Sequence, residues 1–376
     1  MTTPDSNMQH SEGEAALVTP RVRRGDWARA RDTEGVVCQT HVGGQALLEG
    51  IMMRGKYNWA VAVREPRGDI YIEEHDLVSG RPRNSWMYKP VVRGCTAMVE
   101  SLALGYRALD IAARHAFDFE DDEPSPEEQE SEEPIQSASS DSIPKPLMTI
   151  SMVLGVVLGI GIFVVLPAII TNLLVGDYGE KTLLWNIVDG LLRIAIFIFY
   201  IWLIGRMKDI QRMFGYHGAE HKTIHCYEHG LELTVANART FPTLHVRCGT
   251  AFLLTTMLIA ILVFTVVPVS AAIDALGVTN GVLRLVLVIL SRIILLPLVA
   301  GLSYEVTVKW AGAHPESPLV QFVLWPGLQM QRLTTNEPDD GQLQCAIAAM
   351  ERVLEREDRE QAAKQLNIEP GQATPA

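Results

Sequence analysis

Four histidines recur at intervals of four residues in one short segment, accompanied by two carboxylates: His217, Glu220, His221, His225, Glu228 and His229. At about 100° per residue, a step of four residues drifts by only about 40°, so on a helix the four imidazoles would share one arc of about 120°. Imidazole nitrogens on one face could converge on a single metal ion.

The first five residues of this segment also match a catalytic pattern. Residues 217–221 read His-x-x-Glu-His, the inverted form of the zinc-protease motif. In that motif two histidines one turn apart hold the metal, and the adjacent Glu activates a water molecule. We therefore predict His217 and His221 as ligands of a divalent metal, zinc in the first place, and Glu220 as the base that takes the proton from the water.

The sequence does not decide which residues complete the set of metal ligands. A catalytic zinc site needs a third protein ligand and a free position for water. Glu305, on a neighbouring predicted span, is the better geometric candidate than Glu228, and His225 is the alternative. A second arrangement would give a closed structural site with two nitrogen and two sulfur ligands, drawn from His225, Cys226, His245 and Cys248.

The segment also has an interpretation without metal. A helix at a membrane surface can carry several histidines simply because they are amphipathic, and Gly218 weakens a helix by about 1 kcal/mol relative to Ala. Half of the chain's ten histidines lie between residues 217 and 245, which favours a metal site over this reading.

The elements that must position these residues belong to a membrane protein, because 48 % of the 376 residues are apolar. Four apolar stretches are long enough to cross about 30 Å of hydrocarbon at about 1.5 Å per residue: residues 148–175, about 184–205, 248–273 and about 282–304. We expect an integral membrane α-helical fold with about four transmembrane helices over residues 146–310. The histidines then lie in a loop at 206–247.

Loop charges predict the orientation, because Lys and Arg near span ends are retained in the cytoplasm. The outer connections hold only Lys181. The connection between the second and third spans holds Arg206, Lys208, Arg212, Lys222, Arg239 and Arg247. We therefore expect a multi-pass protein of the cytoplasmic (inner) membrane with both termini, and the histidine loop, in the cytoplasm. The five cysteines show no paired spacing, which favours reduced thiols on that side.

Ionisable residues inside the spans should face a partner or a cavity. Asp189 and Arg193 form an i,i+4 pair that would neutralise itself. Arg292 has no partner on its own helix, so it either donates hydrogen bonds within the bundle or binds an anionic lipid or substrate group.

Residues 35–118 are expected to form a small cytoplasmic α+β domain, with short strands at 36–41, 60–64 and 70–74 and an amphipathic helix at 95–117. Residues 43–54 are predicted as a turn and helix start, although Glu49 with Arg54 could bind a polar ligand. In the C-terminal region, 311–376, residues 341–364 should form an amphipathic helix for packing or pairing, followed by a polar tail.

Two segments are predicted to be disordered. Residues 1–34 read as an N-terminal arm without a signal peptide, since their arginines are not followed by an apolar core. Residues 119–145 carry a run of Asp and Glu among Pro, Ser and Gln, and cannot bury enough apolar surface to fold.

Five motifs, taken in order, resemble the YqhQ-like bacterial membrane proteins: residues 43–54, Arg93-Gly94, residues 216–222, residues 245–250, and residues 331–335 with 337–340. This is a domain-of-unknown-function family whose members are labelled predicted metal-dependent enzymes. The resemblance implies that His217, Glu220, His221, His245 and Cys248 belong to the shared pattern. Val246 stands where proline is expected, and this departure leaves the candidate ligands intact.

We therefore expect a membrane-bound metal-dependent enzyme, a zinc hydrolase at the cytoplasmic membrane face. The alternative is a non-catalytic membrane scaffold or assembly factor with a structural or absent metal site, and a transporter comes third. The expected partners are the lipid bilayer and proteins that bind the cytoplasmic domain, without nucleic acid, and oligomerisation stays open.

Overall fold

The computed structural model describes residues 41–77, 85–116, 145–178, 181–245, 248–311, 314 and 317–365. The predicted arm at 1–34, the strand at 36–41 apart from His41, the acidic linker apart from Lys145, and the polar tail lie outside these ranges.

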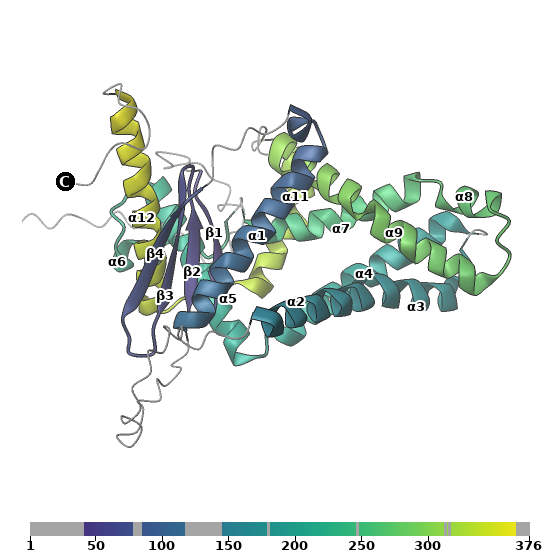
Figure 1. The fold of residues 1–376 in the computed structure, drawn as a ribbon, viewed down its shortest axis with the longest axis horizontal. Helices are drawn as coiled ribbons and strands as arrows, with labels where there is room; N and C mark the ends of the chain where they lie inside the picture. Colours follow the sequence, from purple (N-terminus) through teal and green to yellow (C-terminus); the bar gives the residue numbers. More distant parts are fainter. Residues whose placement is uncertain are drawn as a thin grey trace, which may run out of the picture.

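A four-stranded antiparallel meander lies at one end of the molecule (Figure 1), with the strands in the order β1-β2-β3-β4. Its strands are β1 (Gly43–Leu47), β2 (Gly50–Arg54), β3 (Asn58–Arg64) and β4 (Ile70–Asp76). β3 and β4 confirm the strands predicted at 60–64 and 70–74.

Helices cover both faces of this sheet: α1 (Val92–His115), α5 (Lys208–Glu228) and α12 (Asp340–Gln365). α1 packs against the face that carries Met52 and Val61. α5 and α12 pack against the face that carries Ile51 and Met53. We call the sheet with these three helices the sheet layer. It is assembled from the predicted N-terminal domain, the histidine loop and the C-terminal region, and α1 and α12 confirm the two amphipathic helices predicted there.

The helix start predicted within residues 43–54 is wrong, because this segment forms the hairpin β1–β2. The chain turns at Leu48 and Glu49, and Glu49 adopts a left-handed φ of 48°. Ile51, Met52 and Met53 are all buried, since helices cover both faces of β2. A strand buried on both faces reads as a continuous apolar run and lacks the alternation that identifies a half-buried strand.

Among the described residues, four helical segments are long and apolar enough to cross a membrane, in agreement with the predicted spans: Val153–Val175, Thr182–Ile204, Phe252–Ala275 and Gly281–Trp310. They are built from α2 (Lys145–Ile160), a π-helical stretch (Gly161–Val165), α3 (Leu166–Val175), α4 (Thr182–Ile204), α7 (Gly249–Val266), α8 (Val269–Ala275), α9 (Gly281–Tyr304) and a π-helical end (Glu305–Trp310). We call these helices the membrane bundle, which extends away from one side of the sheet layer (Figure 1).

A charged cluster lies in the interior of the membrane bundle. The Asp189 carboxylate pairs with Arg193 at 3.0 Å and with Arg292 at 3.1 Å, and all three side chains are buried. Arg292 also donates to Asn186 Oδ1 at 2.8 Å. The partner that Arg292 lacks on its own helix is therefore supplied by α4.

Glu305 fastens α1 to the end of the fourth span. Its carboxylate accepts hydrogen bonds from the Arg93 guanidinium and, at 3.1 Å, from the Val91 backbone N–H. Val91 has a φ of 69°, which is unusual for a β-branched residue. Gly94 of α1 and Gly301 of α9 approach so closely that a Cβ on Gly94 would lie 2.9 Å from Gly301 Cα.

Three further helical elements complete the described fold: a 3-10 turn (Ser85–Tyr88), α6 (Val235–Arg239) and α11 (Pro318–Thr334). α11 packs on the membrane bundle, where Met330 shares a buried cluster with Phe197 of α4 and Leu254 of α7. After α6, Thr243 and Leu244 lie along α5, and His245 and Cys248 also lie beside this helix.

Candidate metal centre

The histidine segment forms the helix predicted for it, and that helix is buried. All residues of α5 from Gly215 to Cys226 are buried between the sheet, α12 and the end of α11. Gly218 makes this close packing feasible, since a Cβ there would lie 2.1 Å from the Asn336 carbonyl oxygen. The glycine that weakens the helix locally is thus required by its surroundings.

The imidazoles of α5 do not converge on one point. His217 and His221 face Cys248, whereas His225 faces His245 and Glu228. His229 lies just past the helix end. The drift of about 40° per turn turns the later histidines away from the first pair, and two separate groups result.

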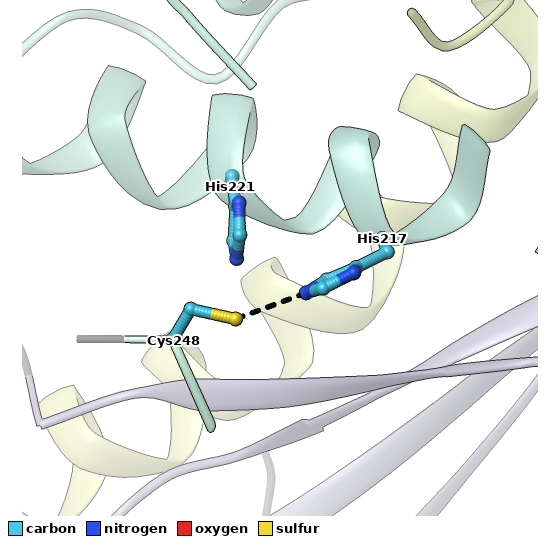
Figure 2. A group of neighbouring side chains, drawn as sticks. All are labelled: His217, His221 and Cys248. Atoms are coloured by element: carbon cyan, nitrogen blue, oxygen red, sulfur yellow. Dashed lines mark hydrogen bonds between the residues drawn. The ribbon is translucent and has the colours of Figure 1, made fainter. Parts of the chain in front are cut away.

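The first group contains His217, His221 and Cys248, with one nitrogen or sulfur atom from each lying within 4.8 Å of the others. Figure 2 shows the two imidazoles, on successive turns of α5, pointing toward the sulfur at the start of α7. His217 Nε2 lies 3.1 Å from Cys248 Sγ. His221 is 1 % exposed and His217 is 9 % exposed, while Cys248 is half-buried.

Backbone carbonyls orient both imidazoles. His217 Nδ1 donates to the Thr334 carbonyl at 2.8 Å, and His221 Nδ1 donates to the Thr243 carbonyl at 2.5 Å. These hydrogen bonds place the proton on Nδ1 and leave the lone pair on Nε2 facing the group. A second-shell hydrogen bond of this kind is what metal-bound histidines usually make.

His221 Nε2 is buried and has no hydrogen-bond partner among the described residues. Leaving such an atom unsatisfied costs about 1–3 kcal/mol. Zinc bonds of about 2.0–2.1 Å to nitrogen and about 2.3 Å to sulfur would separate N and S by about 3.6 Å in a tetrahedron. The three donor atoms lie within 4.8 Å of one another, and His217 Nε2 and Cys248 Sγ are 3.1 Å apart, so small side-chain shifts would fit the residues to a zinc ion.

The second group contains His225, Glu228 and His245, all buried and also within 4.8 Å of one another. His225 Nε2 donates to the Leu244 carbonyl at 2.9 Å, and His245 Nε2 lies 3.5 Å from Glu228 Oε2. Gln331 of α11 holds the His245 backbone through two hydrogen bonds of 2.8 Å. These contacts fix the segment that carries Cys248.

Glu220, the predicted base, lies on the side of α5 that faces β1. Its Oε1 accepts a hydrogen bond of 2.8 Å from the Gly44 backbone N–H. A Cβ on Gly44 would lie 2.8 Å from Glu220 Cδ, so the glycine is needed for the approach. Burial raises the pKa of the Glu220 carboxyl, against the opposing effects of His217 and of the Gly44 N–H.

Burial favours the neutral form of His221 and His245, the form that metal binding requires. Burial lowers the pKa of His221 well below its usual value, and His217 and His245 lower it further. Burial also lowers the pKa of His245 to about 4. Neutral imidazoles present a lone pair at neutral pH without first losing a proton.

Two ligand arrangements expected from the sequence are not formed. Glu305 is outside both groups, because its carboxylate is engaged by Arg93 and Val91. The set of two nitrogens and two sulfurs is divided, because Cys226 Sγ donates to the Glu232 carbonyl at 3.3 Å while Cys248 joins His217.

Glu228, the less favoured carboxylate in the sequence, lies in the second group, whereas Glu305 does not. Four residues that shape the centre did not emerge as candidates from the sequence: Gly44, Thr243, Gln331 and Thr334. Thr243 and Thr334 act through backbone carbonyls, which any residue offers, so their type carries no signal. The conspicuous Gln-Arg-Leu-Thr-Thr run at 331–335 was the signal available for Gln331 and Thr334.

The fold and the site together define a polytopic helical membrane protein with a buried histidine–cysteine group beside the bundle. The chain belongs to the family described as "Protein of unknown function (DUF1385)", whose profile matches residues 89–356. It is similar to "Uncharacterized protein YqhQ" of Bacillus subtilis (strain 168), with 29 % identity over 316 residues that cover 84 % of this chain and 92 % of the relative. This confirms the resemblance noted in the sequence. No solved structure gives a significant match.

Proposed function

We propose that the chain is a membrane-bound metal-dependent hydrolase that holds zinc with His217, His221 and Cys248. The observation that carries this proposal is the buried Nε2 of His221, which faces two further donor atoms and has no hydrogen-bond partner in the described part of the chain. Imidazole and thiolate donors suit zinc, whereas magnesium and calcium prefer oxygen.

Three protein donors favour a catalytic over a structural centre. Structural zinc sites are closed by four protein ligands, while catalytic sites keep one position open. The half-buried Cys248 leaves one edge of this group accessible, and the second group of His225, Glu228 and His245 makes its own contacts.

In the proposed reaction the chain's own residues position ligands and move a proton. Zinc, when bound, supplies Lewis acidity that activates water and polarises a substrate oxygen. The Thr334 and Thr243 carbonyls keep His217 and His221 aimed at the ion. Glu220 accepts and returns a proton, and burial favours this role because it raises the pKa of the carboxyl.

The proposal also includes an orientation. The sheet, α5 and α12 share one buried core, so the segments before the first span, between the second and third, and after the fourth lie on one side of the bilayer. The Lys and Arg excess of these segments favours the cytoplasmic side of the inner membrane. Reporter fusions after residue 376 and near residue 230 should both report cytoplasm, and a periplasmic signal from either would contradict this orientation.

Metal analysis of the full-length protein in detergent tests the site. Wild type and His314→Ala, which alters an exposed histidine, should each bind about one zinc per chain, whereas His217→Ala, His221→Ala and Cys248→Ala should lose most of it. Equal metal content in all variants would refute the assignment of these ligands.

A second variant separates catalysis from a structural role. Glu220→Gln should retain the metal but lower the hydrolysis of a panel of fluorogenic ester, amide and phosphodiester substrates by about 10²–10⁴-fold. Full activity in Glu220→Gln would remove the residue from the mechanism. Metal binding without hydrolysis in the wild type would favour the scaffold alternative.

A further inference from the structure

α11 presents an apolar face with three exposed large side chains. Leu319 is 59 % exposed, Phe322 is 76 % exposed and Trp325 is 43 % exposed. These residues lie three apart and therefore occupy one side of the helix. Residues 317–331 contain no Lys, Arg, Asp or Glu, so this side is not a solvated polar surface.

This face continues the lipid-facing surface of the membrane bundle. The other side of α11, which carries Val320, Leu328 and Gln331, is buried. Near the end of the helix, Met330 packs against Phe197 of α4 and Leu254 of α7, which are two of the spans. α7 itself exposes Leu253 and Leu258 in the manner expected of a span in lipid. An apolar patch bordered by lipid-facing helices has hydrocarbon as its nearest apolar environment.

The end of α11 reaches the candidate metal centre. The Thr334 carbonyl accepts the His217 hydrogen bond, and the Gln331 side chain holds the His245 backbone. The half-buried donor, Cys248, directly precedes α7. The accessible edge of the site is therefore at the start of α7, which is one of the spans, and at the end of α11, while His221 is enclosed.

We propose that α11 lies in the bilayer with Leu319, Phe322 and Trp325 against lipid acyl chains, and that the centre opens at headgroup level and takes an amphiphilic substrate from the membrane. The substrate class rests on the proposed hydrolase function. The lipid contact of α11 and the direction of access do not depend on it.

Photo-cross-linking of the full chain in phospholipid nanodiscs tests the lipid contact. With p-benzoylphenylalanine in place of Phe322, irradiation should yield phospholipid adducts at a level similar to Leu174, an exposed residue of the first span. Replacement of Glu351, an exposed residue of α12, should yield adducts about tenfold less often. Adducts at position 322 only with a second protein chain, or no more than at position 351, would overturn the proposal.

Access to the centre is tested with a phospholipid that carries a maleimide on its headgroup. In metal-free protein with Cys38→Ser and Cys95→Ser, the lipid should modify Cys248, and Cys248→Ser should abolish the adduct, because Cys226 and Cys345 are buried. A Glu351→Cys variant on α12 should react with soluble maleimide but not with the lipid. Modification of Cys248 by soluble maleimide alone would overturn access from the membrane, whatever the zinc content proves to be.

Discussion

The membrane bundle and the candidate metal centre both bury polar side chains, but the first has an excess of cationic groups and the second has an excess of lone pairs. In the membrane bundle, Asp189 lies between Arg193 and Arg292, so cationic groups outnumber the carboxylate. In the candidate metal centre, two imidazole nitrogens and a sulfur face one another, and no described residue donates a hydrogen bond to His221 Nε2. An excess of lone pairs in a buried site is what a bound cation would satisfy.

The two regions should therefore respond differently to mutation. Breaking the charged cluster should damage the folded state whether or not a ligand is present. Mutation of the candidate metal centre should mainly remove the additional stability that the proposed zinc ion gives to the folded state.

The largest effect is expected from Asp189→Ala, which leaves two buried guanidinium groups without their carboxylate. Removal of one partner of a buried ion pair costs about 3–5 kcal/mol. Thermal unfolding in detergent should show a large decrease in the melting temperature, and Asp177→Asn, at an exposed position, should show almost none. A wild-type melting temperature in Asp189→Ala would show that the cluster contributes little to stability.

Zinc should stabilise the wild type and not the ligand variants. At a free zinc concentration of about 100 times the Kd, binding to the folded state adds about 2.7 kcal/mol. Unfolding of chelator-treated protein with and without added zinc measures this difference. His221→Ala should lose the gain, and His314→Ala should keep it; the same gain in both variants would place the ion elsewhere.

A smaller effect is expected where β1 meets Glu220. In Gly44→Ala the new Cβ would lie 2.8 Å from Glu220 Cδ and 2.8 Å from the Met52 carbonyl oxygen, and overpacking of this kind costs about 1–3 kcal/mol. Gly43→Ala is the matched control, because a Cβ there meets no atom within 4 Å. Equal melting temperatures for the two variants would show that Glu220 can move away at no cost.

The smallest effect concerns pH in the metal-free protein. Between the usual imidazole pKa of 6.5 and the folded pKa of about 4 for His245, the unfolded chain binds more protons than the folded chain. Stability is therefore complete above this window and decreases as the pH falls through it, by about 1 kcal/mol per pH unit. His221 acts in the same direction, and the raised pKa of Glu220 acts against it.

Denaturant unfolding at several pH values measures this slope, and His245→Asn should flatten it. A slope unchanged in His245→Asn would assign the pH dependence to other groups.

The sequence predicted the parts of the fold that have strong local signals. The four apolar spans are too long to be anything but membrane or buried helices, and the spacing of His217 and His221 carries the helical period of α5. The hairpin β1–β2 was not predicted, because β2 is buried on both faces and therefore lacks the alternation of apolar and polar residues that identifies a strand.

The candidate site could be predicted only in part. His217 and His221 were assigned from their spacing, but the partners of Glu305 lie more than 200 residues away in the sequence, and nothing local identifies them. The carbonyls of Thr243 and Thr334 depend on the path of the chain, which residue type does not encode. Tertiary contacts of this kind become visible only in the folded protein.

X-ray absorption at the zinc edge of the full-length protein tests the central assignment most directly. We predict one sulfur at about 2.3 Å and at least two imidazole nitrogens at about 2.0–2.1 Å from zinc, with the sulfur lost in Cys248→Ala. A zinc shell without sulfur in the wild type, or a sulfur that persists in Cys248→Ala, would contradict binding by His217, His221 and Cys248.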